Sequence, residues 1–174
     1  MITTQLITLA DIRAIKSIAL NIQQEKELIP YVLEAQKFDL AKFLGFEFYY
    51  DLIQDFATSP SLSDYSLLFN GGEYTHEGKT YYLNGVKNLT IYYAYRRYVN
   101  NSNVIATPTG FVHKTNQHSE SVSEKTISRL VDNAQSSASF VEDNIKEYLD
   151  RKKADYPLWK SCKVMSNRTK IRQV

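Results

Sequence analysis

The stretch that decides the fold runs from residue 84 to residue 98 and reads NGVKNLTIYYAYRRY. Apolar and aromatic side chains recur in it at spacings of three and four, which is typical of an amphipathic helix. We therefore predict a central helix over about 86–101, preceded by Asn84-Gly85. The residues expected to form its core are Leu89, Tyr92, Tyr93 and Tyr98.

A long polar segment over residues 102–121 follows this helix and shows no periodicity. Loops of this length inside a compact domain are usually functional or disordered, so we expect it to contact a partner. Its end, Ser121-Val122-Ser123-Glu124, resembles a capping box and predicts the start of a second long helix. Small residues in the middle of that helix, from Ala134 to Ser139, would allow a neighbouring element to approach closely.

The first half of the chain predicts further helices and one hairpin. Helical periodicity runs from Lys26 to Leu44, stops at Gly45 and resumes over Phe46–Phe56. A short helix over 62–69 precedes an alternating pattern over Glu73–Leu83, with Glu77-Gly78 in the turn. The predicted fold class is mainly α: a small bundle of about four to five helices with one inserted β-hairpin and an extended basic C-terminal arm.

Length and composition indicate one globular domain rich in tyrosine. The chain has 174 residues, with 13 Tyr and 8 Phe but only 6 Gly. Tyrosine combines an apolar ring with a polar hydroxyl, so it suits both the rim of a core and a protein interface. Composition alone leaves these two interpretations open.

Charge is distributed unevenly along the chain. The net charge is +2, yet the segment from residue 160 to the end has five basic residues and no acidic one, which leaves −3 on residues 1–159. We divide the chain at this point into a helical domain (1–159) and a basic arm (160–174). The arm is either a solvated tail or a segment that orders against an acidic partner or a neighbouring subunit. Its basic residues are Lys160, Lys163, Arg168, Lys170 and Arg172.

The sequence contains no recognisable set of catalytic, metal-binding or cofactor-binding residues. His113 and His118 lie five apart without a bracketing Cys or carboxylate pair, and the single Cys162 has no nearby base. The glycines lack the context of a phosphate-binding loop. We therefore expect no enzyme, no cofactor and no metal site. The lone cysteine, the lack of a signal-peptide pattern and the lack of a long apolar run predict an intracellular protein outside the membrane.

An alternative function is nucleic-acid binding or regulation by a small helical protein. Lys87, Arg96 and Arg97 interleave with tyrosines on the predicted central helix, as in a surface on which bases stack. Tyrosine and arginine on a helix flanked by Leu and Val more often form an internal face with paired charges, and we favour that interpretation over a stacking surface. In this alternative the basic C-terminal tail supplies the main contact with nucleic acid.

Several segments, in this order, resemble the small head–tail connector (adaptor) proteins of tailed bacteriophages, especially those of Bacteroidetes phages, prophages and crAss-like phages. The similarity is spread over most of residues 9–160. Each motif alone is weak, but their order and spacing are fairly specific. The segments are IPYVLEAQ (29–36), LG (44–45), YYDL (49–52), GVKNL (85–89), YYAYRRY (92–98), TPTGFVHK (107–114) and YPLW (156–159).

The resemblance implies a helical protomer that assembles into a ring, typically dodecameric, beneath the portal. Such a ring joins the portal to the next neck or tail protein and extends the channel through which double-stranded DNA passes without sequence-specific binding. The protein would be made in the host bacterial cytoplasm and located in the virion neck. For the portal and subunit contacts we expect the five basic residues of the arm together with Thr107, Pro108, Gly110, Phe111 and Lys114.

Overall fold

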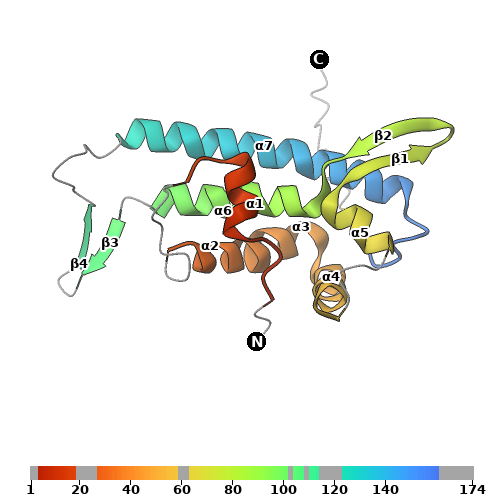
Figure 1. Cartoon of the computed structure of the whole chain (residues 1–174), viewed down its shortest axis with the longest axis horizontal. Helices are drawn as coiled ribbons and strands as arrows, with labels where there is room; N and C mark the ends of the chain where they lie inside the picture. The colour runs from red at the N-terminus through yellow and green to blue at the C-terminus, as the bar shows by residue number, and fades with distance from the viewer. Residues whose placement is uncertain are drawn as a thin grey trace, which may run out of the picture.

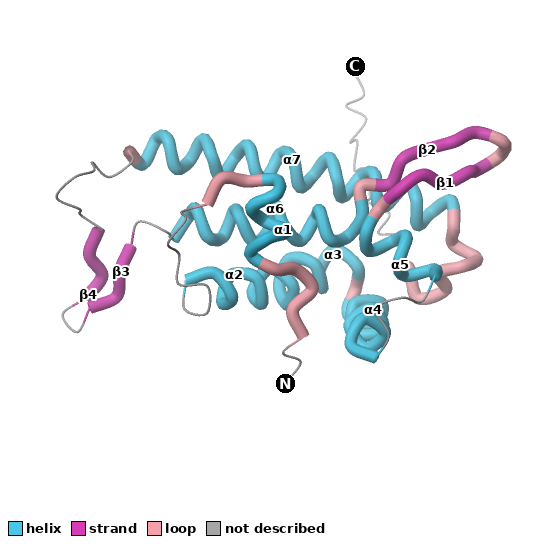
Figure 2. Tube along the Cα trace, in the orientation of Figure 1, coloured by secondary structure: helices cyan, strands magenta, loops and turns pink. Residues whose placement is uncertain are grey.

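The computed structural model describes residues 4–18, 27–58, 63–101, 104–107, 110–113 and 123–160. As predicted, the fold is mainly helical (Figures 1 and 2). In chain order the elements are α1 (Leu9–Ile15), α2 (Ile29–Glu34), the π-helix η2 (Ala35–Leu40), α3 (Ala41–Leu44), α4 (Phe46–Thr58), α5 (Ser63–Asn70), β1 (Gly72–His76), β2 (Lys79–Leu83), α6 (Gly85–Asn101), β3 (Val104–Thr107), β4 (Gly110–His113) and α7 (Glu124–Arg151).

Helix α6 is the centre of the fold. Figure 1 shows it running alongside α7 in the opposite direction, with α2 and α3 on its other side and α1 crossing it. Of the four residues predicted for its core, Leu89 and Tyr93 are buried, whereas Tyr92 and Tyr98 are half-buried and pack against the core. The α7 residues Ala134 and Ala138 are buried as well, whereas Ser136 is exposed, so the two alanines of the predicted small-residue segment lie in the packed interior. Small side chains at such positions let two helices approach closely.

The helical pattern from Lys26 to Leu44 corresponds to α2, η2 and α3 in succession. Pro30 lies in the first turn of α2, where its missing N–H costs no hydrogen bond. Gly45 ends α3 with a φ of 84°, as its position after the last periodic residue predicted. The π-helical turn between α2 and α3 was not predicted from the sequence. Such turns are rare and recur at functional sites.

The N-terminal segment is fixed to the bundle through the π-helix. The buried side chain of Gln36 accepts a hydrogen bond from the Leu6 backbone N–H (2.9 Å) and donates one to the Thr4 carbonyl (2.9 Å). Leu6 and Ile7 are buried, and Thr8 then caps α1 in a capping box with Asp11. A single glutamine side chain therefore satisfies backbone groups of a segment that has no secondary structure of its own.

The predicted hairpin is present as β1–β2, with Glu77 and Gly78 in its turn at φ values of 50° and 75°. Two residues of positive φ form the type of turn that matches the twist of a two-stranded hairpin. The hairpin rests on α7: the Tyr74 and Tyr148 rings meet edge to face at 4.8 Å, and Arg151 donates to the Tyr74 hydroxyl (2.7 Å). This contact supplies the support that an isolated hairpin lacks.

Two expectations need correction. We expected residues 102–121 to lack secondary structure, yet β3 and β4 within this segment form a second antiparallel hairpin, in which Thr107 pairs with Gly110. The N-cap of α7 is Ser123 rather than Ser121, because the Ser123 hydroxyl accepts from the Thr126 N–H (3.3 Å). Four-residue strands carry too short an alternation to be recognised, and two nearby serines offered equivalent caps.

Two glycines close the base of the β1–β2 hairpin. Gly71 and Gly85 both have positive φ (79° and 82°), and their backbones touch: a Cβ on Gly85 would lie 2.5 Å from the Gly71 nitrogen. No side chain fits there unless the backbone moves. The close approach fixes where α5, the hairpin and α6 meet.

We predict that Gly85→Ala lowers the free energy of unfolding by more than about 2 kcal/mol, because a positive φ costs ~1–2 kcal/mol and the backbone clash adds to it. Gly78→Ala is the matched control. Gly78 also has positive φ, but a Cβ added there would meet nothing within 4 Å, so only the cost of about 1 kcal/mol for the backbone conformation is expected. Urea denaturation of the two variants measures the difference, and equal losses would show that the glycine contact does not restrain the fold.

Candidate interaction surface

The residues predicted to contact the portal or a neighbouring subunit fall in two places. Thr107 and Gly110 form the last pair of the β3–β4 hairpin, and Phe111 belongs to β4. Figure 1 places this hairpin at the opposite end of the molecule from β1–β2. Lys160 is exposed, and its Nζ lies 2.6 Å from Glu47 Oε2 on α4. The remaining predicted contact residues lie outside the described part of the chain: Pro108, Lys114, Lys163, Arg168, Lys170 and Arg172.

The basic residues of α6 form ion pairs within the domain. Lys87 Nζ lies 2.6 Å from an Asp11 carboxylate oxygen, which ties α1 to α6. Burial acts against the charged form of Asp11, yet the bond from Lys87 and the hydrogen bonds from Thr8 outweigh it and lower the pKa of the carboxyl. Lys87 is thereby engaged with an acidic neighbour in the same protein.

The two arginines of α6 converge on Asp39 of the π-helix. Arg97 Nε lies 2.6 Å from one Asp39 oxygen, and Arg96 lies 3.1 Å from the other. Arg97 also reaches Glu34 (3.2 Å), and Arg96 donates to Gln135 of α7. The hydrogen bond to Asp39 is the main cause that raises the pKa of Arg97. This network joins α2, η2, α6 and α7, so the arginines fit the internal interpretation of the motif better than a surface for stacking bases.

Tyrosine serves mainly in the core. Six of the 13 tyrosines are buried and only Tyr50 and Tyr82 are exposed. The Tyr93 hydroxyl donates to Glu142 Oε1 (2.6 Å), and burial together with this carboxylate raises the tyrosine's pKa. Composition left two roles open for tyrosine, the rim of the core and a protein interface. Most of the tyrosines pack in the core or against it, and a few lie on the surface.

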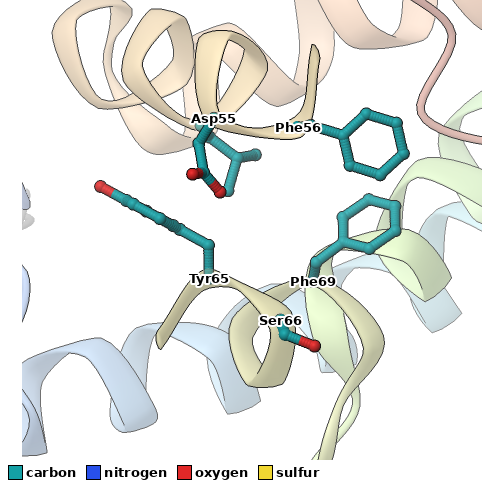
Figure 3. Close-up of a pocket in the computed structure, with 6 residues that line it drawn as sticks. Asp55, Phe56, Tyr65, Ser66 and Phe69 are labelled. Carbon is teal, nitrogen blue, oxygen red and sulfur yellow. The ribbon is translucent and has the colours of Figure 1, made fainter. Parts of the chain in front are cut away.

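A small cavity between α4 and α5 is too small for a substrate. Figure 3 shows Asp55 between Tyr65 and the ring pair Phe56 and Phe69. The cavity measures about 10 Å³, which is close to the space of a single water. Burial and the neighbouring Asp51 carboxylate raise the pKa of Asp55, while Tyr65 donates its hydroxyl to Asp51.

A wider feature is a groove between α6 and α7, which we call the α6/α7 groove. It has a volume of about 420 Å³ and no charged residue in its lining. Phe140, on its α7 side, is 70% exposed, the highest exposure of any large apolar residue in the described part of the chain. The lining residues are Asn84, Asn88, Tyr92, Ser136, Ser137, Phe140 and Val141.

A second exposed aromatic feature lies on α4, and we call it the α4 patch. It consists of Phe46 (67% exposed) and Tyr50 (49% exposed), which are one helical turn apart and therefore share a face. Interfaces are enriched in aromatic residues and depleted of charge at their centres. Within the described part of the chain, the α4 patch and the α6/α7 groove are therefore candidate protein-binding surfaces. Sequence analysis missed both, because periodicity cannot show which aromatic residues of a helix remain outside the core.

Over the described ranges, no group of three or more His, Cys, Asp or Glu side chains could hold a metal ion. Within those ranges no helix combines the length and apolarity needed to cross a bilayer.

One sequence family matches most of the chain. The profile of a family of unknown function, DUF6712, matches residues 40–169, which include α3 to α7. The chain belongs to this family. No curated protein matches the chain, and no solved structure does either. Since the DUF6712 family has no assigned function, the resemblance to head–tail connectors stays a prediction.

We predict that Asp39→Asn destabilises the domain by roughly 1–3 kcal/mol, because two partly buried arginines lose their shared carboxylate. Asp143→Asn is the control: Asp143 is 79% exposed and pairs with Lys146 one turn away, so its loss should cost less than about 0.5 kcal/mol. Thermal and urea unfolding of both variants test this. A similar small effect at both positions would mean that the network does not stabilise the helix packing.

Proposed function

We propose that the chain is a structural subunit of a phage head–tail connector, which assembles into a ring between the portal and the neck or tail. The observation that carries the proposal is the pair of exposed aromatic surfaces, the α4 patch and the α6/α7 groove, on one folded domain. A ring is a heterologous assembly, in which each subunit offers two different surfaces to its two neighbours. The two surfaces lie on different helices, the patch on α4 and the groove along α6 and α7 (Figure 1).

The segments that resemble connectors coincide with structural units of the domain. IPYVLEAQ forms α2 and the start of η2, LG forms the end of α3, and the two tyrosine-rich segments belong to α4 and α6. TPTGFVHK includes the last residue of β3 and all of β4, and YPLW contains Tyr156 and Trp159, both buried against Phe48. The similarity therefore falls on residues that build the fold, which supports a shared architecture with the connector family.

The proposal also gives a role to the β3–β4 hairpin and to the basic segment of the sequence that follows Lys160. The β3–β4 hairpin and the segment that follows Lys160 are candidate contacts with the portal or a neighbouring subunit. In this proposal the ring is dodecameric, meets the portal on one side and the next neck or tail protein on the other, and lets double-stranded DNA pass without sequence-specific contacts. The protein acts in the virion neck after synthesis in the host bacterial cytoplasm, and has no catalytic role.

The proposal predicts retention of the purified chain on portal particles of the phage or prophage that encodes it. Co-sedimentation and electron microscopy would detect the bound ring, and portal particles that fail to retain the chain would contradict the proposal. Salt-dependent DNA binding that needs residues 160–174, without portal retention, would instead favour the nucleic-acid-binding alternative.

Deletion of residues 160–174 should spare folding and abolish retention. The Lys160–Glu47 pair is exposed, and such surface pairs contribute little to stability. Trp159, the last large buried residue described, remains in place and keeps its bond from Nε1 to Asp150 (2.8 Å). A control variant keeps the length and replaces Lys163, Arg168, Lys170 and Arg172 with Gln, which separates the role of charge from that of chain length. A deletion that unfolds the domain would show that its boundary lies further along the chain.

A further inference from the structure

Several polar side chains of the α6/α7 groove use their own protons inside the protein. Ser136 and Ser137 each donate to a backbone carbonyl one turn earlier in α7, at 2.9 Å. The Asn84 amide nitrogen donates to Asn144 Oδ1 at 3.1 Å. The oxygen atoms of these side chains still have lone pairs. The groove is therefore better equipped to accept hydrogen bonds from a ligand than to donate them.

Asn88 supplies the acceptor that most needs a partner. This residue lines the groove from α6, between Asn84 and Tyr92 at spacings of four. Its Oδ1 atom is buried and accepts no hydrogen bond from the described residues. A buried acceptor without a donor is costly, so a ligand that brings a donor is favoured. The terminal torsion of an asparagine side chain is soft, which lets this oxygen turn toward the groove.

The rest of the lining limits which donor can enter. No charged side chain lines the groove, so an ammonium or guanidinium group would lose its water there without gaining a carboxylate partner. Phe140 is 70% exposed and offers an aromatic ring for packing. The volume of about 420 Å³ is typical of sites for small ligands. The matching ligand is an uncharged aromatic ring that carries an O–H or N–H donor.

Tyrosine and tryptophan are the side chains that present this chemistry in a protein partner. Each combines a large apolar ring with a neutral donor, the phenol O–H or the indole N–H. Both are enriched among the residues that dominate the binding energy of interfaces, where they fill desolvated pockets. The groove therefore fits one aromatic anchor of a partner protein.

The exposed tyrosines of this chain are poorly suited to be that anchor. All 13 tyrosines and the single tryptophan lie in described residues, and only Tyr50 and Tyr82 are exposed. Glu47 is one turn before Tyr50 in α4, and Glu73 lies directly opposite Tyr82 in the β1–β2 hairpin. A carboxylate brings no donor to a groove lined by acceptors and would lose water against it. A different protein is therefore the better source of the anchor.

We propose that the α6/α7 groove is an anchor site for a tyrosine or tryptophan side chain of a different protein. In the complex, the ring packs against Phe140, and its hydroxyl or indole N–H donates to Asn88 Oδ1. The inference rests on the proposed function, in which the ring meets the portal on one side and the next neck or tail protein on the other. It states the chemistry by which one of these partners enters the groove.

Titration of the full-length chain with p-cresol, the side-chain analogue of tyrosine, tests the chemistry of the site. Toluene, which lacks the hydroxyl, is the matched probe. We expect p-cresol to shift the backbone amide NMR signals of Asn88, Ser137 and Phe140. It should bind about 5–10-fold more tightly than toluene, as one net hydrogen bond implies. Equal affinities of the two probes, or shifts confined to other parts of the chain, would overturn the proposal.

Two variants and a control assign the contacts. Asn88→Leu keeps the size of the side chain but removes the acceptor, so it should abolish the preference for p-cresol while toluene still binds. Phe140→Ser should weaken both probes by about 10-fold and leave the melting temperature nearly unchanged, because the residue is exposed. The control is Phe38→Ser, since Phe38 is similarly exposed (52%) but lies on η2, and both affinities should stay at the wild-type values. A preference for p-cresol that survives in Asn88→Leu would overturn the assigned hydrogen bond.

Partner binding separates this inference from the proposed function. Binding to portal particles and to the next neck or tail protein is measured for the wild type, Asn88→Leu and Phe140→Ser. We expect Phe140→Ser to weaken one of the two contacts by about 10-fold or more, as for a central aromatic contact. If both contacts form in the wild type and neither variant weakens them, the anchor site is overturned and the proposed function stands.

Two further outcomes are also decisive. Self-association of the isolated chain that Phe140→Ser abolishes would place a second copy in the groove and overturn the assignment to a different protein. Failure of the wild-type chain to bind either partner counts against the proposed function, whereas the p-cresol titration tests the site by itself.

Discussion

The burial of α6 is the constraint on which the rest of the structure depends. From Gly85 to Val99 this helix packs on several sides, against α1, α2, η2, α5 and α7, and leaves little of its surface for solvent. A helix in that position cannot carry free charges, because an unpaired ion in a partly buried site is costly. Lys87, Arg96 and Arg97 are accordingly matched by Asp11, Asp39 and Glu34, each from an element that crosses or flanks α6. The same pairs fix where those elements lie.

This arrangement determines what remains available for binding. The cations of α6 are used internally, and the α6/α7 groove is lined by amides, hydroxyls and apolar side chains rather than by charged ones. The hairpin β1–β2 is held against α7 by Tyr74, Tyr148 and Arg151 and by the glycine contact at its base, so it forms part of the folded domain. The α4 patch and the α6/α7 groove thus lie on helices of the packed domain.

Much of the fold could be predicted from local patterns. Gly45, Pro30 and the Glu77-Gly78 turn act through backbone conformation, which the sequence reveals directly, and the stripe on α7 from Ala134 to Leu149 is buried as its period indicates. Features that depend on distant residues were missed. The π-helical turn follows from tertiary packing around Gln36 and Asp39, and the pairing of Arg96 and Arg97 with Asp39 joins residues more than fifty positions apart. The α4 patch and the α6/α7 groove could not be predicted from the sequence for the same reason. Most of the predicted arm lies outside the described residues.

The claim that α6 organises the domain is tested most directly by native-state hydrogen exchange. Amides that open only when the whole domain unfolds exchange most slowly. The account predicts that the slowest amides lie in α6, from Leu89 to Tyr95, and that their opening free energy equals the free energy of global unfolding from urea denaturation. The facing residues of α7, around Ala138, should follow closely. If α6 amides exchange through a local opening of lower free energy than those of α4 or α5, the central position assigned to this helix is contradicted.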